Sequence, residues 1–130
     1  VKVIAQAKEK GVKLALVTAA SEAIAKSFLS FNSIEGLFDV VVFAKKDEPG
    51  KPDPALFLRG LKELNLRPDE VVAIEDSLNG VNSARAAQCA VLWLTSNKAF
   101  SAENGIYQVR SWEEIGQWLQ VAEQVIRPLC

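Results

Sequence analysis

The sequence contains no histidine and no methionine, and it has only two cysteines in 130 residues. Without histidine, a Ser-His-Asp or Cys-His triad is excluded, and so are most zinc sites. Cys89 lies in an apolar stretch and Cys130 is the last residue, so the two do not form a disulfide framework. Their number favours a reducing, cytoplasmic setting. Any chemistry on this chain therefore has to use carboxylates, lysine, hydroxyl groups and a hard metal ion.

The sequence also lacks a long apolar run and a strong excess of charge. No apolar stretch approaches the ~20 residues that a membrane span needs. The 15 basic and 16 acidic residues nearly cancel, to a formal net charge of -1. These features give no indication of a nucleic-acid or membrane partner. A hydrophobic fraction of 49% is instead typical of one soluble globular domain.

Short apolar runs alternate with helix-like patterns along the chain. The runs at 14–17, 40–43, 71–74 and 90–94 predict strands buried on both faces, and 106–109 predicts a short fifth strand. Helices are predicted at 1–11, from 21, from 53, at 81–87 and from 111, with a loop at 96–105. This alternation is typical of an α/β fold, a Rossmann-like three-layer α/β/α sandwich around a parallel sheet.

Apolar residues at helical spacing predict which helix faces turn to the core. After Ser21, one apolar stripe is formed by Ile24, Phe28 and Phe31. Asp53 is predicted as the N-cap of the next helix, with Pro54 at its first position. The predicted core faces of two later helices are Phe57, Leu58, Leu61 and Leu64, and Ile115, Trp118, Leu119, Ala122 and Ile126.

Polar side chains follow three of the predicted strands. Thr18 follows 14–17, Lys51 lies between Gly50 and Pro52 after 40–43, and Glu75-Asp76 follow 71–74. Because ligands of parallel sheets bind beyond the carboxyl ends of the strands, we expect these residues on one edge of the sheet. Two adjacent carboxylates repel each other and need a counter-charge. A hard cation bound through oxygens, Mg²⁺ above all, would supply it.

Each of these residues also has an ordinary structural interpretation. Thr18 or Ser21 could cap the following helix, Lys51 could be a surface lysine, and the acidic pair could be a solvated turn. Asn79-Gly80 is interpreted as a turn that leads into a helix, with no chemistry required. Taken singly, the capping and surface interpretations are favoured. The functional prediction therefore depends on the order and context of the set.

That order resembles the haloacid dehalogenase (HAD) superfamily of hydrolases. Residues 16–21 (Leu-Val-Thr-Ala-Ala-Ser) look like its second motif and residues 50–54 (Gly-Lys-Pro-Asp-Pro) like its third. Residues 72–81 (Val-Ala-Ile-Glu-Asp-Ser-Leu-Asn-Gly-Val), followed by 84–87, are very similar to the fourth. The third and fourth blocks together resemble the branch of β-phosphoglucomutase-like and phosphoglycolate-phosphatase-like proteins. Gln88-Cys89 departs from the family, which more often has glycine there, and this puts the turn geometry in question.

The resemblance implies a role for each residue of the set. Thr18 would hydrogen-bond the transferring phosphoryl group, with help from the Ala19 N–H. Lys51 would stabilise charge on that group and on the nucleophile. Glu75 and Asp76 would hold Mg²⁺, with either or both as ligands. The implied function is transfer of a phosphoryl group from a small phosphorylated metabolite, by a phosphatase or a phosphomutase.

The nucleophile that the family requires is absent from the sequence. The first aspartate of an Asp-x-Asp pair attacks phosphorus and forms an aspartyl phosphate, and the second is the general acid/base. This chain has no Asp-x-Asp. The family places that motif, and usually a cap domain, before the helix that begins this chain. We therefore expect residues 1–130 to be the C-terminal part of a HAD-like core without a cap, with the missing N-terminal segment as its partner.

The missing motif has a structural consequence and leaves alternatives open. Its strand is central in the family, between the strands at 14–17 and 71–74, so we expect two unpaired strand edges. The chain alone is expected to be inactive. One alternative is a non-catalytic phosphate- and metal-binding or regulatory module. A receiver-type signalling domain ranks far behind, because there the acidic pair comes first and the lysine last.

Overall fold

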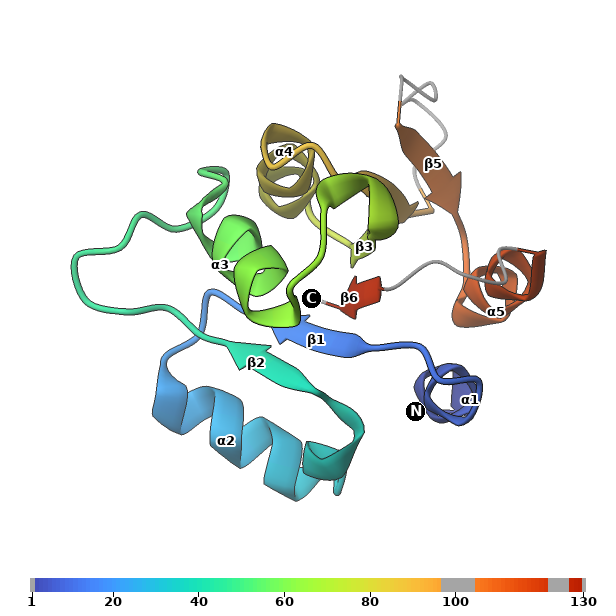
Figure 1. Cartoon of the computed structure of the whole chain (residues 1–130), viewed down its shortest axis with the longest axis horizontal. Helices are drawn as coiled ribbons and strands as arrows, with labels where there is room; N and C mark the ends of the chain where they lie inside the picture. The colour runs from blue at the N-terminus through green and yellow to red at the C-terminus, as the bar shows by residue number, and fades with distance from the viewer. Residues whose placement is uncertain (1, 97–104, 122–126, 130) are drawn as a thin grey trace.

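A computed structural model of the chain describes residues 2–96, 105–121 and 127–129, and it shows one sheet between two layers of helices (Figure 1). The strands are β1 (Leu14–Val17), β2 (Val40–Val42), β3 (Val72–Glu75), β4 (Ala90–Leu94), β5 (Ile106–Val109) and β6 (Arg127–Leu129). The α-helices are α1 (Lys2–Glu9), α2 (Glu22–Phe31), α3 (Ala55–Leu64), α4 (Leu78–Ala86) and α5 (Trp112–Val121), and the 3-10 helices are η1 (Glu35–Leu37) and η2 (Pro68–Glu70). The predicted α/β fold with a parallel sheet is confirmed.

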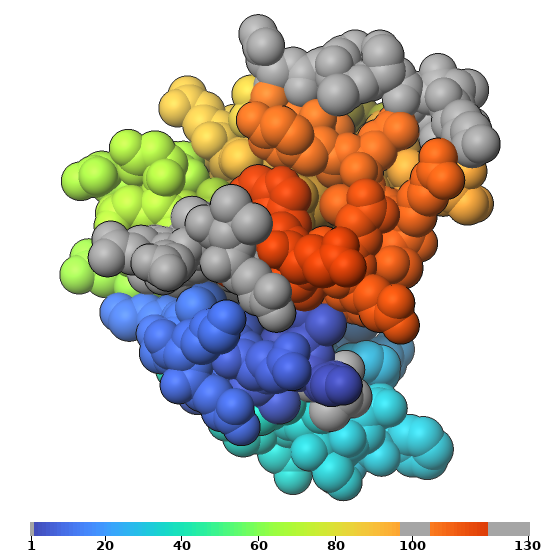
Figure 2. Space-filling view, turned by 90° about the vertical axis from the view of Figure 1, so that its right-hand side faces the viewer, coloured from blue at the N-terminus to red at the C-terminus, as the bar shows by residue number. Residues whose placement is uncertain are grey.

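Alternating side chains of the strands pack into two hydrophobic cores, one on each face of the sheet. Ala15 and Val17 point to the face covered by α3 and α4, and they pack in a cluster with Phe57 and Val81. Leu14 points to the opposite face, where a second cluster contains residues of α1 and α5. Helices α1 and α5 lie side by side there (Figures 1 and 2). Within the described ranges, no helix is long and apolar enough to cross a membrane.

Most predicted elements occur within a residue or two of their predicted bounds, but the predicted face of α2 is wrong and one residue of the predicted α3 face is misplaced. On α2 the buried residues are Ala25 and Leu29, while Ile24, Phe28 and Phe31 are 63%, 52% and 90% exposed. On α3, Leu58 is exposed and Leu56 is buried in its place. Ala122, Ile126 and most of the predicted loop at 96–105 lie outside the described residues.

The helix that follows Asp53 also begins differently from the prediction. Its N-cap is Pro54, so the proline precedes the helix and does not open it. The Asp53 side chain still satisfies the first turn, because its Oδ1 accepts a hydrogen bond from the Ala55 N–H at 2.9 Å. The Asp53-Pro54 signal therefore marked the right helix with an error of one position.

The centre of the sheet is occupied by the last strand of the chain. All pairings are parallel, and the strand order is β2-β1-β6-β3-β4-β5. The expectation that the edges of β1 and β3 are unpaired is therefore wrong, since β6 lies between them and pairs with both (Figure 1). The reason is that an extended C-terminal segment satisfies backbone groups which would otherwise lack partners.

Candidate active site

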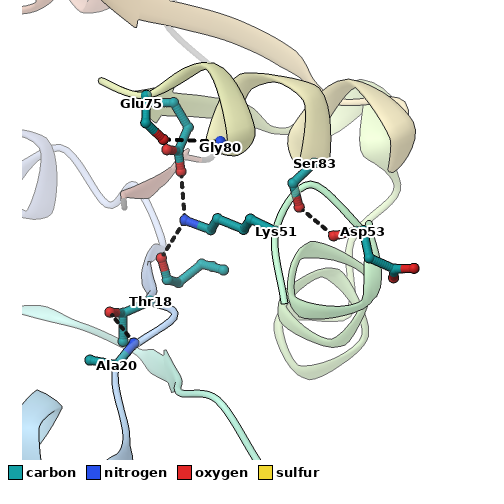
Figure 3. Close-up of polar contacts among 9 residues, drawn as sticks. Thr18, Ala20, Lys51, Asp53, Glu75, Gly80 and Ser83 are labelled. Carbon is teal, nitrogen blue, oxygen red and sulfur yellow. Dashed lines mark hydrogen bonds and ion pairs between the residues drawn. The ribbon is translucent and has the colours of Figure 1, made fainter. Parts of the chain in front are cut away.

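The carboxyl ends of β1 and β3 and the loop before α3 meet at one edge of the sheet (Figure 3). Lys51 reaches across this edge from the loop. Its Nζ donates to the Glu75 Oε2 at 2.8 Å and to the backbone carbonyl of Val17, the last residue of β1, at 3.3 Å. Thr18 follows Val17 directly. The structure thus brings Thr18, Lys51 and Glu75 together, as the sequence predicts.

The Lys51–Glu75 ion pair is shielded from solvent. The side chains are only 12% and 2% exposed, so the charges attract each other more strongly than an exposed pair would. The ring of Phe57 lies beneath the ammonium group, with its centre 5.2 Å from Nζ, a geometry in which the ring face attracts a cation. Removing one partner would leave a buried charge without compensation. The surface interpretation of Lys51 is therefore wrong.

Gly80 makes room for the Glu75 carboxylate. A Cβ atom at Gly80 would lie 1.6 Å from Glu75 Oε1, which no side chain allows. Ser77 caps α4 through its hydroxyl, which accepts a hydrogen bond from the Gly80 N–H at 3.0 Å. Asn79-Gly80 lies in the first turn of α4, so its interpretation as a helix entry is confirmed, although the two residues belong to the helix and not to a separate turn before it. Sequence reasoning missed this role, although glycine within a helix is unfavourable unless something needs the space of its missing side chain.

Asp76 has a different environment from Glu75. Its side chain is exposed, and it forms no ion pair with another residue in the described part of the chain. No group of three potential metal ligands occurs among the described residues. Mg²⁺ is commonly held by one or two carboxylates together with phosphate oxygens and waters. The available donors, one free carboxylate beside a lysine-paired one, fit such an open site.

The loop between β1 and α2 contains both candidate helix caps, and the structure separates their roles. Ser21 is the N-cap of α2, with its hydroxyl accepting from the Ile24 N–H at 3.4 Å. Thr18 is not the cap. Its Oγ1 accepts from the Ala20 N–H at 3.1 Å, which tightens the loop beside the sheet edge (Figure 3). Ala19 lies exposed between them. The loop can therefore present the Thr18 hydroxyl and nearby N–H groups to an anion.

Two further contacts hold the loop that carries Lys51. The buried hydroxyl of Ser83 on α4 donates to the Asp53 carbonyl at 2.6 Å. Arg59 on α3 donates to the Phe43 carbonyl and forms an ion pair with Glu48 at 3.1 Å. The loop is thus tied to both helices on its face of the sheet, which limits the positions that Lys51 can take.

Comparison with known proteins shows the family and the fold. Residues 1–94 match the model of the haloacid dehalogenase-like hydrolase family. A phosphorylated carbohydrates phosphatase of Thermotoga maritima is 42% identical over 80 residues, covering 62% of this chain and 37% of that protein. The protein CbbY of Cereibacter sphaeroides is 36% identical over 88 residues, covering 65% of this chain and 38% of that protein.

Solved structures agree with the sequence relatives. CbbY from Rhodobacter sphaeroides in complex with phosphate superposes with a TM-score of 0.77 at 29% identity, over 88% of this chain and 53% of that one. A phosphatase from Thermococcus onnurineus gives 0.79 at 26% identity, over 92% and 55%. The chain therefore spans about two fifths of these sequence relatives and about half of these structures. It belongs to the haloacid dehalogenase-like hydrolases.

Proposed function

We propose that this chain supplies the phosphate- and metal-binding side of a Mg²⁺-dependent phosphatase or phosphomutase that acts on a small phosphorylated metabolite. The observation that carries the proposal is the position of Lys51. Its ammonium group is held between the Glu75 carboxylate and the carbonyl of Val17, the residue directly before Thr18. A cation fixed at a strand edge beside a hydroxyl is suited to stabilise a transferring phosphoryl group. The phosphatases among the relatives support this reaction class.

The residues divide the work by their environments. Thr18 and the Ala19 N–H bind phosphoryl oxygens, and Lys51 offsets the negative charge that develops on them. Asp76 is the principal ligand of Mg²⁺, because its carboxylate is exposed and Glu75 is engaged by Lys51. Glu75 positions Lys51. A Mg²⁺ ion held by Asp76 would neutralise phosphate charge and help to orient the ester.

The nucleophilic carboxylate comes from outside residues 1–130, which contain no Asp-x-Asp. Its attack forms a bond between carboxylate oxygen and phosphorus and breaks the ester bond to the departing alcohol, which takes a proton. A cytoplasmic setting is part of the proposal, since the buried Cys89 is a free thiol and thiols persist in reducing compartments.

Titration calorimetry with Mg²⁺ and inorganic phosphate tests the proposal on the chain as it is. We expect Mg²⁺ and phosphate to bind more tightly together than either does alone, and Asp76→Asn to remove the Mg²⁺ contribution. Asp69→Asn is the matched control, because that side chain is 72% exposed and lies in η2. Equal Mg²⁺ binding by both variants would contradict the assignment of Asp76.

Turnover provides the second test. We expect no Mg²⁺-dependent hydrolysis of p-nitrophenyl phosphate by the chain alone, because the attacking carboxylate is missing. Hydrolysis that depends on Mg²⁺ and is lost in Lys51→Met would show that residues 1–130 contain a nucleophile after all.

A further inference from the structure

Two polar or charged residues are buried among those that the structure describes, and both bind the turn that carries Lys51. They are Glu75, which is 2% exposed, and Ser83 on α4, which is 0% exposed. A hydroxyl group that leaves water without a hydrogen bond costs free energy, and alanine forms helices better than serine does. The place of Ser83 in α4 therefore gives no local reason for a serine. The reason has to lie in what its hydroxyl binds.

The hydroxyl of Ser83 holds the end of a four-residue turn. The Asp53 N–H donates to the Gly50 carbonyl at 3.0 Å, which closes the turn with Lys51 at its second position. The Ser83 hydroxyl donates to the Asp53 carbonyl at 2.6 Å, and the Asp53 carboxylate accepts from the Ala55 N–H at 2.9 Å. A serine inside a helix commonly bonds a carbonyl of its own helix. Here the hydroxyl binds outside the helix, two residues from Lys51.

Both ends of the Lys51 side chain are anchored against α4 (Figure 3). Gly80 leaves the space that the Glu75 carboxylate occupies. Ser83 lies three residues later on the same side of the helix and binds the turn from which the lysine extends. The lysine spans the interval between the two and reaches Glu75 Oε2 at 2.8 Å. Helix α4 therefore fixes the ammonium group relative to the two carboxylates.

We propose that Ser83 is a positioning residue for phosphate binding. Its hydroxyl sets the place of the Lys51 ammonium group and so couples the binding of phosphate at Thr18 to the binding of Mg²⁺ at Asp76. The inference rests on the proposed function for its ligands, while the placement of Lys51 depends only on the contacts of Ser83. A serine that merely joins α4 to the loop before α3 would contribute to stability without acting through Lys51.

A double-mutant cycle measures whether the effect passes through Lys51. The readout is titration calorimetry with inorganic phosphate in the presence of Mg²⁺. We expect Ser83→Ala to weaken phosphate binding about fivefold, the net contribution of one hydrogen bond, and to leave the binding of Mg²⁺ alone unchanged. In the Lys51→Met background the same substitution should have no effect on phosphate affinity, because the group that it positions is gone.

Ser111→Ala is the matched control. Its hydroxyl accepts a hydrogen bond from the Glu114 N–H at 3.1 Å at the start of α5, on the opposite face of the sheet. The control therefore removes one hydroxyl hydrogen bond far from the Lys51 turn. It should lower stability and leave the affinity for phosphate unchanged.

A spectroscopic measurement follows Lys51 without any ligand. In protein labelled with carbon-13 at lysine Cε, the Lys51 signal is the one that Lys51→Met removes. The centre of the Phe57 ring lies 5.2 Å from Nζ, so the ring current makes this signal sensitive to a small displacement. We expect Ser83→Ala to shift the Lys51 signal and to leave that of Lys62, at the end of α3, in place. Ser111→Ala should shift neither.

The two measurements separate this inference from the proposed function. An unmoved Lys51 signal in Ser83→Ala, or an equal loss of phosphate affinity with and without Lys51, would overturn the inference. Phosphate binding that depends on Lys51 but not on Ser83 would overturn it as well. If Ser83→Ala shifts the signal while Lys51→Met leaves phosphate binding unchanged, Ser83 positions the lysine and the proposed function is wrong. Ser83→Cys, which offers a weak thiol donor of similar size, decides the same outcomes if the alanine variant does not fold.

Discussion

At the scale of single residues, two neighbouring carboxylates of the candidate site have different environments. Glu75 is the last residue of a buried strand and is held by Lys51, whereas Asp76 is the first residue beyond it and is exposed. The strand alternation that turns Glu75 toward Lys51 turns the next residue another way. The pair therefore provides one carboxylate that orients a lysine and one that is available to a cation.

Gly80→Ala tests how closely the Glu75 carboxylate packs against α4. Alanine normally stabilises a helix by roughly 0.5–1 kcal/mol relative to glycine. Here the new Cβ would stand 1.6 Å from Glu75 Oε1, so the carboxylate must move and its ion pair with Lys51 weakens. We expect a net loss of about 1–3 kcal/mol in the free energy of unfolding, measured in urea.

Gly116→Ala is the matched control for that substitution. Gly116 also lies within a helix, but its added Cβ would meet only Val3 Cγ2, at 3.5 Å, an ordinary contact. This variant should gain up to about 1 kcal/mol. If Gly80→Ala gains as much as Gly116→Ala, the close approach of Glu75 to α4 does not exist in solution.

Sequence reasoning found the residues of the site but not their contacts. Thr18, Lys51 and Glu75 could be placed on one edge because each follows a recognisable strand. The ring of Phe57 under Lys51 and the space at Gly80 depend on the approach of elements that are far apart in the chain. No local pattern records such an approach. The sequence therefore predicts the chemistry better than the environment that tunes it.

At the scale of secondary-structure elements, the end of α4 shows the cost of a residue that departs from the family pattern. Gln88 follows the C-cap Ala87 and has a φ of 69°, the left-handed region that glycine adopts easily. The Cys89 N–H donates to the Ala84 carbonyl at 3.0 Å and closes the helix end. The turn that the sequence put in question therefore forms with glutamine in the glycine position.

Gln88→Gly should relieve this strain. We expect the free energy of unfolding to rise by about 1 kcal/mol, because a left-handed conformation costs an L-residue roughly 1–2 kcal/mol and glycine loses part of that gain in chain entropy. Gln88→Ala is the control, since alanine has the same Cβ and should give no such gain. Thermal and urea unfolding measure both variants. Equal stability of the glycine and alanine variants would contradict the argument.

Asp39 links the end of α1 to the start of β1, and we expect the strength of this link to depend on pH. Partial burial raises the pKa of Asp39, but hydrogen bonds from Lys8 and from the Leu14 N–H outweigh it and lower the pKa overall. A lowered carboxyl pKa adds stability that is present above the unfolded-state value, about 4, and lost as the pH falls through the folded-state value. Acid should therefore weaken this link.

Asp39→Asn should reduce the loss of stability between pH 6 and pH 3, measured by urea unfolding. The side chain is 35% exposed, so solvent screening limits the difference to under about 1 kcal/mol. Glu9→Gln on α1 is the control, because it removes an exposed carboxylate that forms no ion pair with another described residue. An identical pH dependence for Asp39→Asn and the unchanged chain would show that Asp39 does not contribute.

The exposed stripe on α2 shows why it is easier to predict that a helix forms than to predict which of its faces packs against the rest of the protein. The spacing of Ile24, Phe28 and Phe31 correctly predicts a helix, but Ala25 and Leu29 form the side that meets the sheet. Both stripes have helical periodicity. The choice between them depends on tertiary packing, in which Leu29 joins a buried cluster with Leu16 and Ile34. Periodicity therefore predicts the element and leaves its rotation to tertiary packing.

At the scale of the whole molecule, the sheet is built unevenly around its centre. Strand β4 has four paired residues on each side, with β3 and β5. The central β6 has three pairs with β1 and one with β3. The parallel fold was predictable from the alternation of strands and helices and from the order of the motifs. The central strand was not, because no apolar run marks Arg127–Leu129 as a strand.

Amide hydrogen exchange should reveal this unevenness across the molecule. Amides that open only with the whole fold exchange most slowly, and locally opened segments exchange earlier. We expect Val91 and Leu92 in β4 to be among the slowest, because both lie in the ladders to β3 and β5. The Leu129 amide should exchange on the order of a hundredfold faster, which corresponds to local opening at about 2.7 kcal/mol less than global unfolding. Pro128→Val should slow exchange at Leu129 and leave Val91 almost unchanged, since it adds a donor to β6 alone. If Leu129 exchanges as slowly as Val91 in the unchanged chain, β6 opens only with the entire sheet, and the centre of the molecule is as stable as its β3–β4–β5 side.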